Sequence, residues 1–281
     1  MVVGMPSSGK STYIAALRHV LLSDETPSAL MLTRPADDER HLNRLQDRWL
    51  ASETFERTRQ ASEAWVTFHV RVRSSDVEAE LVVPDLRGET FERPAAAGEC
   101  AKDVFEAFVD AAGLLLFTNA DRPDDANLIS DMGELFAGEE GVADAIEVDL
   151  RASIGFQPDL MPEEAKLVEL LQIANRRPQR RRLRRVAVIA SAWDVVADDG
   201  DQRSPSEWLA QERPMLAQFL ANNADGWETR VYGASAQGGR LPRDRERLQA
   251  LENASERIMI LGYGAAPHDP AAPIAWLLNG A

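Results

Sequence analysis

The sequence has little that points to membranes or to a secreted protein. It contains one cysteine, Cys100, in 281 residues, and no apolar run comes near the 18 residues or so that a membrane-spanning helix requires. A single cysteine excludes an internal disulfide and a cysteine-rich zinc site. The first residues lack the basic and then apolar arrangement of a signal peptide. We therefore expect a cytoplasmic protein that does not insert into a membrane.

Positive charge is also scarce. The 31 lysines and arginines face 46 acidic residues, which gives a formal net charge of −15. Because nucleic acids and anionic membranes attract basic surfaces, this charge argues against general nucleic-acid binding. The histidines have no spacing typical of a metal site; they are His19, His41, His69 and His268. With 44% hydrophobic and 27% charged residues, the composition is that of an ordinary globular protein.

The charge is distributed unevenly in one part of the chain. Residues 121–149 are strongly acidic, and an arginine cluster follows between Arg176 and Arg185. One interpretation is a solvated helix end whose arginines pair with the acidic segment. The other is a docking surface for an acidic partner or an RNA. The sequence leaves both open.

Apolar strands alternate with helical patterns along most of the chain. This alternation predicts an α/β fold whose mostly parallel central sheet has helices on both faces. There is no repeat or Gly/Ser-rich linker, so we expect residues 1–281 to form one domain. The chain has more residues before the strand that ends at Ser191 than a minimal core of this fold needs. This extra length predicts an insertion over 122–185. Expected strands cover 2–3, 65–73, 80–83, 114–117, 186–190 and 230–233; expected helices follow Lys10 and cover 36–51, 101–111, 163–175, 206–222 and 273–278.

The strongest motif lies at the start of the chain. The pattern G-x-x-x-x-G-K-S runs from Gly4 to Ser11, after an apolar strand and before a helical pattern. Glycines let the backbone curl so that its N–H groups point at phosphate oxygens, and the helix N-terminus adds partial positive charge. The motif predicts a P-loop NTPase in which Lys10 contacts the β- and γ-phosphates and Ser11 binds Mg²⁺. Expected phosphate contacts are Gly4, Ser7, Ser8, Gly9, Lys10, Ser11 and Thr12.

A second motif follows the strand at 80–83. Asp85 is placed to hold Mg²⁺, and three positions later Gly88 can offer its N–H to a γ-phosphate. Here the chain resembles the translation-factor-related P-loop GTPases, which include the Ras-like proteins. In those proteins a glutamine usually follows the glycine and orients the attacking water. This chain has Glu89, which implies either a catalytic base or slow hydrolysis that needs a partner.

Two later strand ends carry the features of base recognition. Ser191-Ala192-Trp193-Asp194 resembles the N-K-x-D motif, whose carboxylate accepts hydrogen bonds from guanine N1–H and the exocyclic amine. Serine and alanine stand where asparagine and lysine are usual. Ser235-Ala236 resembles the S-A-K motif, whose backbone N–H contacts guanine O6. Trp193 is expected in the core, and a helix-capping role for Asp194 remains the alternative.

Together these segments are similar to the bacterial double-GTPase family. The resemblance rests on G-x-x-x-S-G-K-S, D-L-R-G-E-T-F, S-A-W-D, Y-G-A-S-A-Q-G-G and P-I-A-W-L-L, which span nearly the whole chain. It implies a GTPase that is encoded beside a second GTPase in bacterial conflict or defence gene clusters. A second GTPase or an effector protein is therefore the expected partner.

A GTPase switch also requires a threonine that closes over Mg²⁺ and the γ-phosphate. We favour Thr58, with Thr54 as the alternative, because Thr58 lies a few residues before a strand. The sequence thus predicts a switch protein that binds GTP and GDP with Mg²⁺ on Ser11, Thr58 and Asp85. Lys10, Glu89 and Thr58 are the candidate catalytic residues. The alternatives are a P-loop ATPase or kinase, and a nucleotide-bound scaffold without turnover.

Overall fold

The computed structural model describes residues 1–54, 65–84, 89–121, 161–176, 184–198, 200 and 202–279. Its centre is a five-stranded sheet in the order β1-β5-β6-β7-β8. The first four strands are parallel and β8 is antiparallel at the edge. These strands are β1 (Val2–Gly4), β5 (Gly113–Asn119), β6 (Arg184–Ser191), β7 (Trp227–Ser235) and β8 (Met259–Leu261). The predicted mostly parallel α/β sheet is confirmed.

A second, antiparallel sheet has the order β2-β3-β4. It consists of β2 (Leu30–Arg34), β3 (Val66–Val72) and β4 (Glu78–Val83). The alternation predicted for β3 is present, since Val66, Phe68 and Val70 are buried. The sequence did not predict β2, because only Leu30 in it is fully buried and its pairing with β3 defines the strand.

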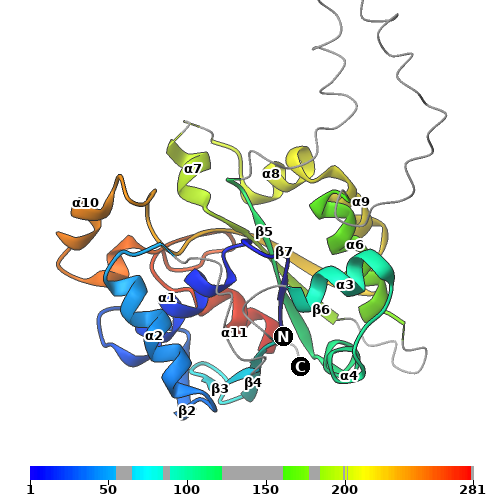
Figure 1. Ribbon diagram of the computed structural model, residues 1–281, viewed down its shortest axis with the longest axis horizontal. Coiled ribbons are helices and arrows are strands. Elements are labelled where there is room, and N and C mark those ends of the chain that lie inside the picture. Colours follow the sequence, from blue (N-terminus) through cyan, green and yellow to red (C-terminus); the bar gives the residue numbers. More distant parts are fainter. Residues whose placement is uncertain are drawn as a thin grey trace, which may run out of the picture.

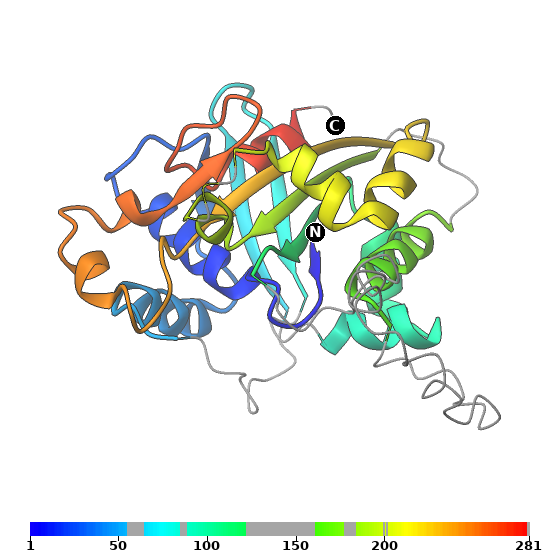
Figure 2. The same ribbon diagram turned by 90° about the horizontal axis from the view of Figure 1, so that it is seen from above.

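Helices cover both faces of the five-stranded sheet (Figure 1). On one face lie α1 (Lys10–Leu22), which packs against α2 (Glu39–Leu50), and α11 (Ala272–Leu278). The opposite side carries α3 (Glu89–Ala97), α4 (Lys102–Asp110), α6 (Glu163–Ala174), α8 (Pro205–Glu212) and α9 (Pro214–Asn222). Shorter elements follow β6 and β7: α7 (Trp193–Asp198), α10 (Arg245–Gln249) and η3 (Ala254–Arg257). The view from above places α10 beside α2 (Figure 2).

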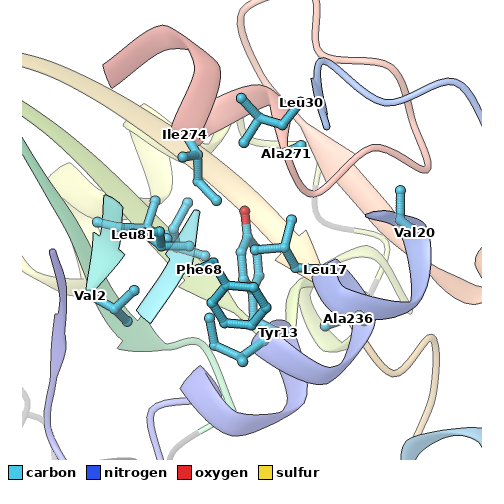
Figure 3. Close-up of a cluster of buried hydrophobic side chains, with 14 of the residues drawn as sticks. Val2, Tyr13, Leu17, Val20, Leu30, Phe68, Leu81, Ala236, Ala271 and Ile274 are labelled. Carbon is cyan, nitrogen blue, oxygen red and sulfur yellow. The ribbon is translucent and has the colours of Figure 1, made fainter. Parts of the chain in front are cut away.

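Two hydrophobic cores lie on opposite faces of the central sheet, because successive side chains of a strand point to opposite sides. Leu115 and Phe117 face the core under α1, whereas Leu114 and Leu116 face α6 and α9. In the first core the Tyr13 ring meets Phe117 edge to face, with centroids 5.1 Å apart. Figure 3 shows Tyr13 beside Phe68, which comes from the second sheet. The second sheet thus closes over α1.

Some predicted elements have different bounds. The helix expected over 206–222 is two helices, α8 and α9, because Pro214 lacks the N–H that a continuous helix needs. Helices α3 and α7 and strand β8 were not predicted. In the described ranges no helix is long and apolar enough to cross a membrane.

The range predicted as an insertion contains core residues. Leu167 and Leu171 of α6 are fully buried, and β6 begins at Arg184. Residues 122–160 and 177–183 lie outside the described residues, so the insertion and its bounds remain predictions. Of the arginine cluster, Arg184 and Arg185 lie over the rings of Trp227 and Trp276, and Arg185 pairs with Glu228 at 2.7 Å. These two arginines pack within the fold, and the predicted pairing of the cluster with the acidic segment falls on residues outside the described ranges.

Candidate functional site

The register of the parallel strands brings the predicted motifs to one edge of the sheet. Gly4 of β1 is paired with Phe117 of β5, and Asn119 at the end of β5 is paired with Ser191 at the end of β6. Ser191 in turn is paired with Ala234 of β7. Open α/β sheets bind ligands at the carboxyl ends of their strands. The phosphate loop, the Asp194 segment and the Ser235 segment therefore lie at the same edge.

The phosphate loop between β1 and α1 requires glycine at two positions. A Cβ on Gly4 would come within 2.8 Å of Ser8 Oγ and 2.9 Å of Phe117 Cβ. A Cβ on Gly9 would lie 2.8 Å from Ser191 Oγ, and the φ of Gly9 is +85°, a left-handed conformation that disfavours other residues. The turn also places Ser7 at a positive φ of 60°. The loop is thus tightly wound against β5 and β6.

Lys10 is the first residue of α1, and its side chain is buried against this loop, with an exposed fraction of 3% for the residue. Its Nζ donates to the carbonyl of Gly4 at 2.8 Å, the carbonyl of Met5 at 2.6 Å and Ser8 Oγ at 3.1 Å. Helix α1 begins here with glycine at its N-cap and no acidic residue in its first turn. A buried ammonium group beside the N-terminus of a helix whose first turn carries no acidic residue suits a phosphate ligand. Ser11 and Thr12 are half-buried in the same turn.

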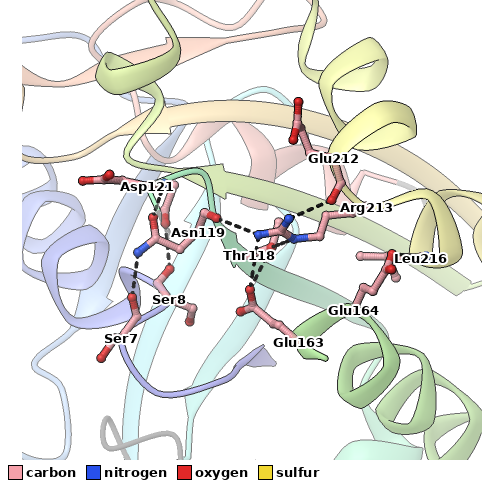
Figure 4. A network of polar contacts seen from close by, with 11 residues as sticks. Ser7, Ser8, Thr118, Asn119, Asp121, Glu163, Glu164, Glu212, Arg213 and Leu216 are labelled. Atoms are coloured by element: carbon pink, nitrogen blue, oxygen red, sulfur yellow. Dashed lines mark hydrogen bonds and ion pairs between the residues drawn. The ribbon is translucent and has the colours of Figure 1, made fainter. Parts of the chain in front are cut away.

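Two side chains from the neighbouring strand ends hold the loop. Asn119 Nδ2 donates to the carbonyl of Ser7 at 2.9 Å, as Figure 4 shows. Ser191 Oγ donates to the carbonyl of Ser8 at 2.9 Å. Asn119 was not predicted as a site residue, although its place at the end of a buried strand was a signal. The serine at position 191 supports the loop from the position where the N-K-x-D motif has asparagine.

A buried polar network lies beside Asn119 (Figure 4). Arg213 donates to the hydroxyl of Thr118 at 3.3 Å and to the carbonyl of Asn119 at 3.2 Å, and it lies 3.8 Å from the carboxylate of Glu163. Glu164 accepts the N–H of Met215 at 2.9 Å. This network joins β5, α6 and the start of α9 next to the phosphate loop.

Asp194 lies in the first turn of α7, directly after β6, and is half-buried. The chain turns sharply before it, since Ala192 has a φ of 55°. The pKa of Arg243 is raised, chiefly by its hydrogen bond to Asp244 and to a smaller degree by the charges of Asp198 and Asp194. Trp193 is buried and meets Trp208 edge to face, which confirms its expected place in the core.

The Ser235 segment forms a closed turn at the end of β7. Ser235 is buried, and its Oγ accepts the N–H of Gly238 at 3.0 Å. The carbonyl of Ala236 accepts Trp49 Nε1–H at 2.8 Å. Arg240, a few residues later, lies 3.6 Å from Asp121, which follows β5. The segment is thus connected to α2 through Trp49 and to the end of β5 through Asp121.

Several predicted site residues lie outside the described residues. They are Thr58, Asp85 and Gly88. Glu89 begins α3, but its side chain belongs to the parts that the structure does not describe. Among the described residues there is no group of His, Cys, Asp or Glu side chains that could hold a metal ion. Of the three predicted magnesium ligands, the structure describes Ser11 alone.

Comparison with known proteins gives one result. A family model described as Double-GTPase 1 matches residues 1–277. No curated protein and no solved structure matches the chain. The match covers the phosphate loop, all the described strand ends of the site and all but the last residue of the C-terminal helix α11. Family membership implies guanine-nucleotide binding, which agrees with the features of the Asp194 and Ser235 segments. The chain belongs to the Double-GTPase 1 family.

Proposed function

We propose that the protein is a guanine-nucleotide switch that binds GTP and GDP with Mg²⁺ and hydrolyses GTP slowly. The observation that carries this proposal is the register of β5, β6 and β7. It brings the phosphate loop, Asp194 and the turn at Ser235 to one edge of the sheet. A P-loop ATPase or kinase would account for Lys10 but not for the other two segments.

The phosphate loop supports the binding of the β- and γ-phosphates. Phosphate oxygens would take the place of some of the carbonyl and hydroxyl acceptors that hold Lys10. Ammonium–phosphate hydrogen bonds are charge-assisted and so stronger than those to neutral carbonyls. Ser7, Ser8, Gly9 and the first turn of α1 would supply further donors to the same phosphates.

Asp194 and the Ser235 turn support selection of guanine. A carboxylate accepts two hydrogen bonds from guanine N1–H and the exocyclic amine, a donor pair that adenine lacks at these positions. The N–H groups of Ala236 and Gln237 have no acceptor among the described residues. They are the donors that we assign to guanine O6.

Ser11, Thr58 and Asp85 would hold Mg²⁺, which on binding neutralises charge that develops on the phosphates. Glu89 has no N–H to donate, so it would either accept a proton from the attacking water or contribute little. We propose slow hydrolysis on this ground. A second GTPase or an effector is the proposed partner, in a cytoplasmic conflict or defence system, and the predicted insertion over 122–185 is where it would dock.

The first test is nucleotide affinity. We expect GDP and GTP to bind more tightly than ADP and ATP, measured by calorimetry with and without Mg²⁺. In Asp194→Asn, GDP binding should weaken about 10- to 100-fold because two charge-assisted hydrogen bonds are lost. Binding of xanthine nucleotides should improve, since the amide reverses the hydrogen-bond polarity.

Asp198→Asn is the matched control, because Asp198 is exposed on the same short helix. It should bind GDP as the unchanged protein does. Equal or tighter ATP binding by the unchanged protein would contradict the guanine assignment. A guanine preference that survives in Asp194→Asn would exclude Asp194 as the residue that reads the base.

Hydrolysis needs a separate measurement. A single-turnover assay with GTP and excess protein should show slow formation of GDP, and Lys10→Ala should abolish it. If GTP binds but is never hydrolysed, also in the presence of the second GTPase, the protein is a nucleotide-bound scaffold.

A further inference from the structure

The turn from Ser235 to Gly238, which we call the base turn, is followed by a segment that contains α10 and η3. The end of α2 is joined to this segment. Three side chains of that segment donate to the last carbonyls of α2 and the residues just after it. Arg257 donates to Trp49 O at 2.8 Å, Gln249 to Ala51 O at 2.9 Å and Arg245 to Ser52 O at 3.0 Å. Carbonyls at a helix C-terminus have no partners within the helix, and cations there are favourable. The end of α2, α10 and η3 therefore form one cross-linked unit (Figure 2).

Trp49 lies at the centre of this unit and is fully buried. The guanidinium of Arg257 lies 4.5 Å from the centre of its ring, and the ring of His19 lies 5.1 Å away. Arg257 also donates to Ser52 Oγ at 3.2 Å. A large ring that is packed against two such neighbours has little freedom to rotate.

The indole of Trp49 makes one hydrogen bond, and it reaches the base turn. Trp49 Nε1–H donates to the carbonyl of Ala236 at 2.8 Å, across 187 positions of sequence. This bond fixes the plane of the peptide between Ala236 and Gln237. In a trans peptide the C=O and the N–H point in opposite directions. With its carbonyl turned toward Trp49, the peptide turns the N–H of Gln237 away from α2.

The opposite end of the turn is fixed as well. Ser235 Oγ accepts the N–H of Gly238, and the carbonyl of Gly238 accepts a hydrogen bond from Arg247 at 2.7 Å. Gly238 has so little space that a Cβ there would come within 2.3 Å of the carbonyl of Arg257. The peptide that Trp49 holds is thus the central one of an otherwise anchored turn.

We infer that Trp49 is a positioning residue for guanine recognition. By holding the Ala236 carbonyl, it orients the N–H of Gln237 in the same peptide, one of the two donors assigned to guanine O6. The inference rests on the proposed function, because it assigns a support to the turn that reads the base. Pre-organised donors bind a ligand more tightly because the turn does not have to be ordered on binding.

The test compares Trp49→Phe with the unchanged protein for three ligands. GDP and inosine diphosphate carry an oxygen at position 6, whereas purine riboside diphosphate does not. The phenyl ring has no N–H, so the Ala236 carbonyl is released. We expect GDP and inosine diphosphate to bind about fivefold more weakly, the effect of one neutral hydrogen bond. Binding of purine riboside diphosphate should be unchanged.

Trp227→Phe is the matched control. Trp227 lies at the other end of β7 and is buried, and its Nε1–H has no acceptor among the described residues. The same substitution there should leave all three affinities as they are. If Trp49→Phe does not fold, benzothienylalanine at position 49 replaces it, because this analogue keeps the shape of tryptophan and lacks the N–H.

The outcomes separate this inference from the proposed function. If Trp49→Phe lost affinity equally for all three ligands, or lost none, the positioning role would be overturned. The proposal that the protein binds guanine nucleotides would be unaffected. If the unchanged protein itself does not prefer ligands with an oxygen at position 6, the proposed base recognition fails, and the role of Trp49 fails with it.

Discussion

At the residue scale, the site depends on small side chains at the ends of strands. Ser191 supports the phosphate loop through one hydrogen bond to Ser8, and it lies so close to Gly9 that a Cβ there would come within 2.8 Å of its hydroxyl. A larger residue at 191 would press on the loop. This contact gives a physical reason for serine where the related motif has asparagine.

Ser191→Ala should therefore weaken nucleotide binding without changing its selectivity. Loss of one neutral hydrogen bond to the loop predicts GDP binding about fivefold weaker. The ratio of GDP to ADP affinity should stay the same, because the base turn is untouched. Calorimetric titration of both nucleotides checks this, with Ser75→Ala, in a distant hairpin, as the control. A changed ratio would contradict the support role.

At the scale of elements, α2 is held to α1 by a buried arginine. Arg18 of α1 is 3% exposed and donates to Gln46, Asn43 and Glu39 of α2. The pKa of Glu39 is lowered, chiefly by the hydrogen bond from Arg18, with partial burial acting against it. Glu39 also accepts the N–H of Ala36 at 2.8 Å, just before the helix. These contacts fix the helix whose last turn carries Trp49.

Glu39→Gln should destabilise the protein in a pH-dependent way. A carboxyl group with a lowered pKa contributes stability above its unfolded pKa, and this stability is lost as the pH falls through the folded pKa. The side chain is 41% exposed, so we expect a loss of only about 1 kcal/mol at pH 7. The difference should persist down to about pH 5 and shrink below about pH 4.

Urea unfolding of both proteins between pH 3 and 7 measures this difference. Glu53→Gln is the control. Glu53 is exposed, and its carboxylate lies 3.8 Å from Arg48 at the other end of the helix, near the limit for an ion pair. A difference that grows as the pH falls would have the wrong sign and would exclude the ion pair as its cause.

At the scale of the whole molecule, the Arg213 network connects the site to the core on the far face of the sheet. Glu163 is 3% exposed and Arg213 is 8% exposed, and they come from α6 and the junction of α8 and α9. Their carboxylate and guanidinium lie 3.8 Å apart. Two charges at such depth are tolerated because each has an opposite charge and hydrogen bonds.

Arg213→Met should lower the free energy of unfolding by about 3 kcal/mol, because it leaves the carboxylate of Glu163 buried without this cation. The double variant Arg213→Met with Glu163→Gln should lose less free energy of unfolding than Arg213→Met alone, because a neutral amide costs less to bury than a carboxylate. Denaturant unfolding measures both. Arg203→Met, which breaks an exposed pair with Glu212, should cost under about 1 kcal/mol. A double variant that is less stable than the single variant Arg213→Met would contradict this account.

Much of the fold could be predicted because its signals are local. The buried strands β5 and β6 are continuous apolar runs, and the phosphate loop has its own glycines, lysine and following helix. The elements that were missed lack such signals. Strand β8 has three residues, two of them exposed, and it exists through its pairing with β7. Its partners are residues 233–235 of β7 and Pro267, outside the short window in which a strand pattern is read.

By itself, the sequence determined the α/β class, the phosphate loop and the family, because each depends on residue types at short spacings. The tertiary structure decided which side chains support that loop and the base turn. Asn119, Ser191 and Trp49 act on residues that lie 112, 183 and 187 positions away. Such contacts arise when parallel strands align their ends and a helix packs beside them, and no short motif records that alignment.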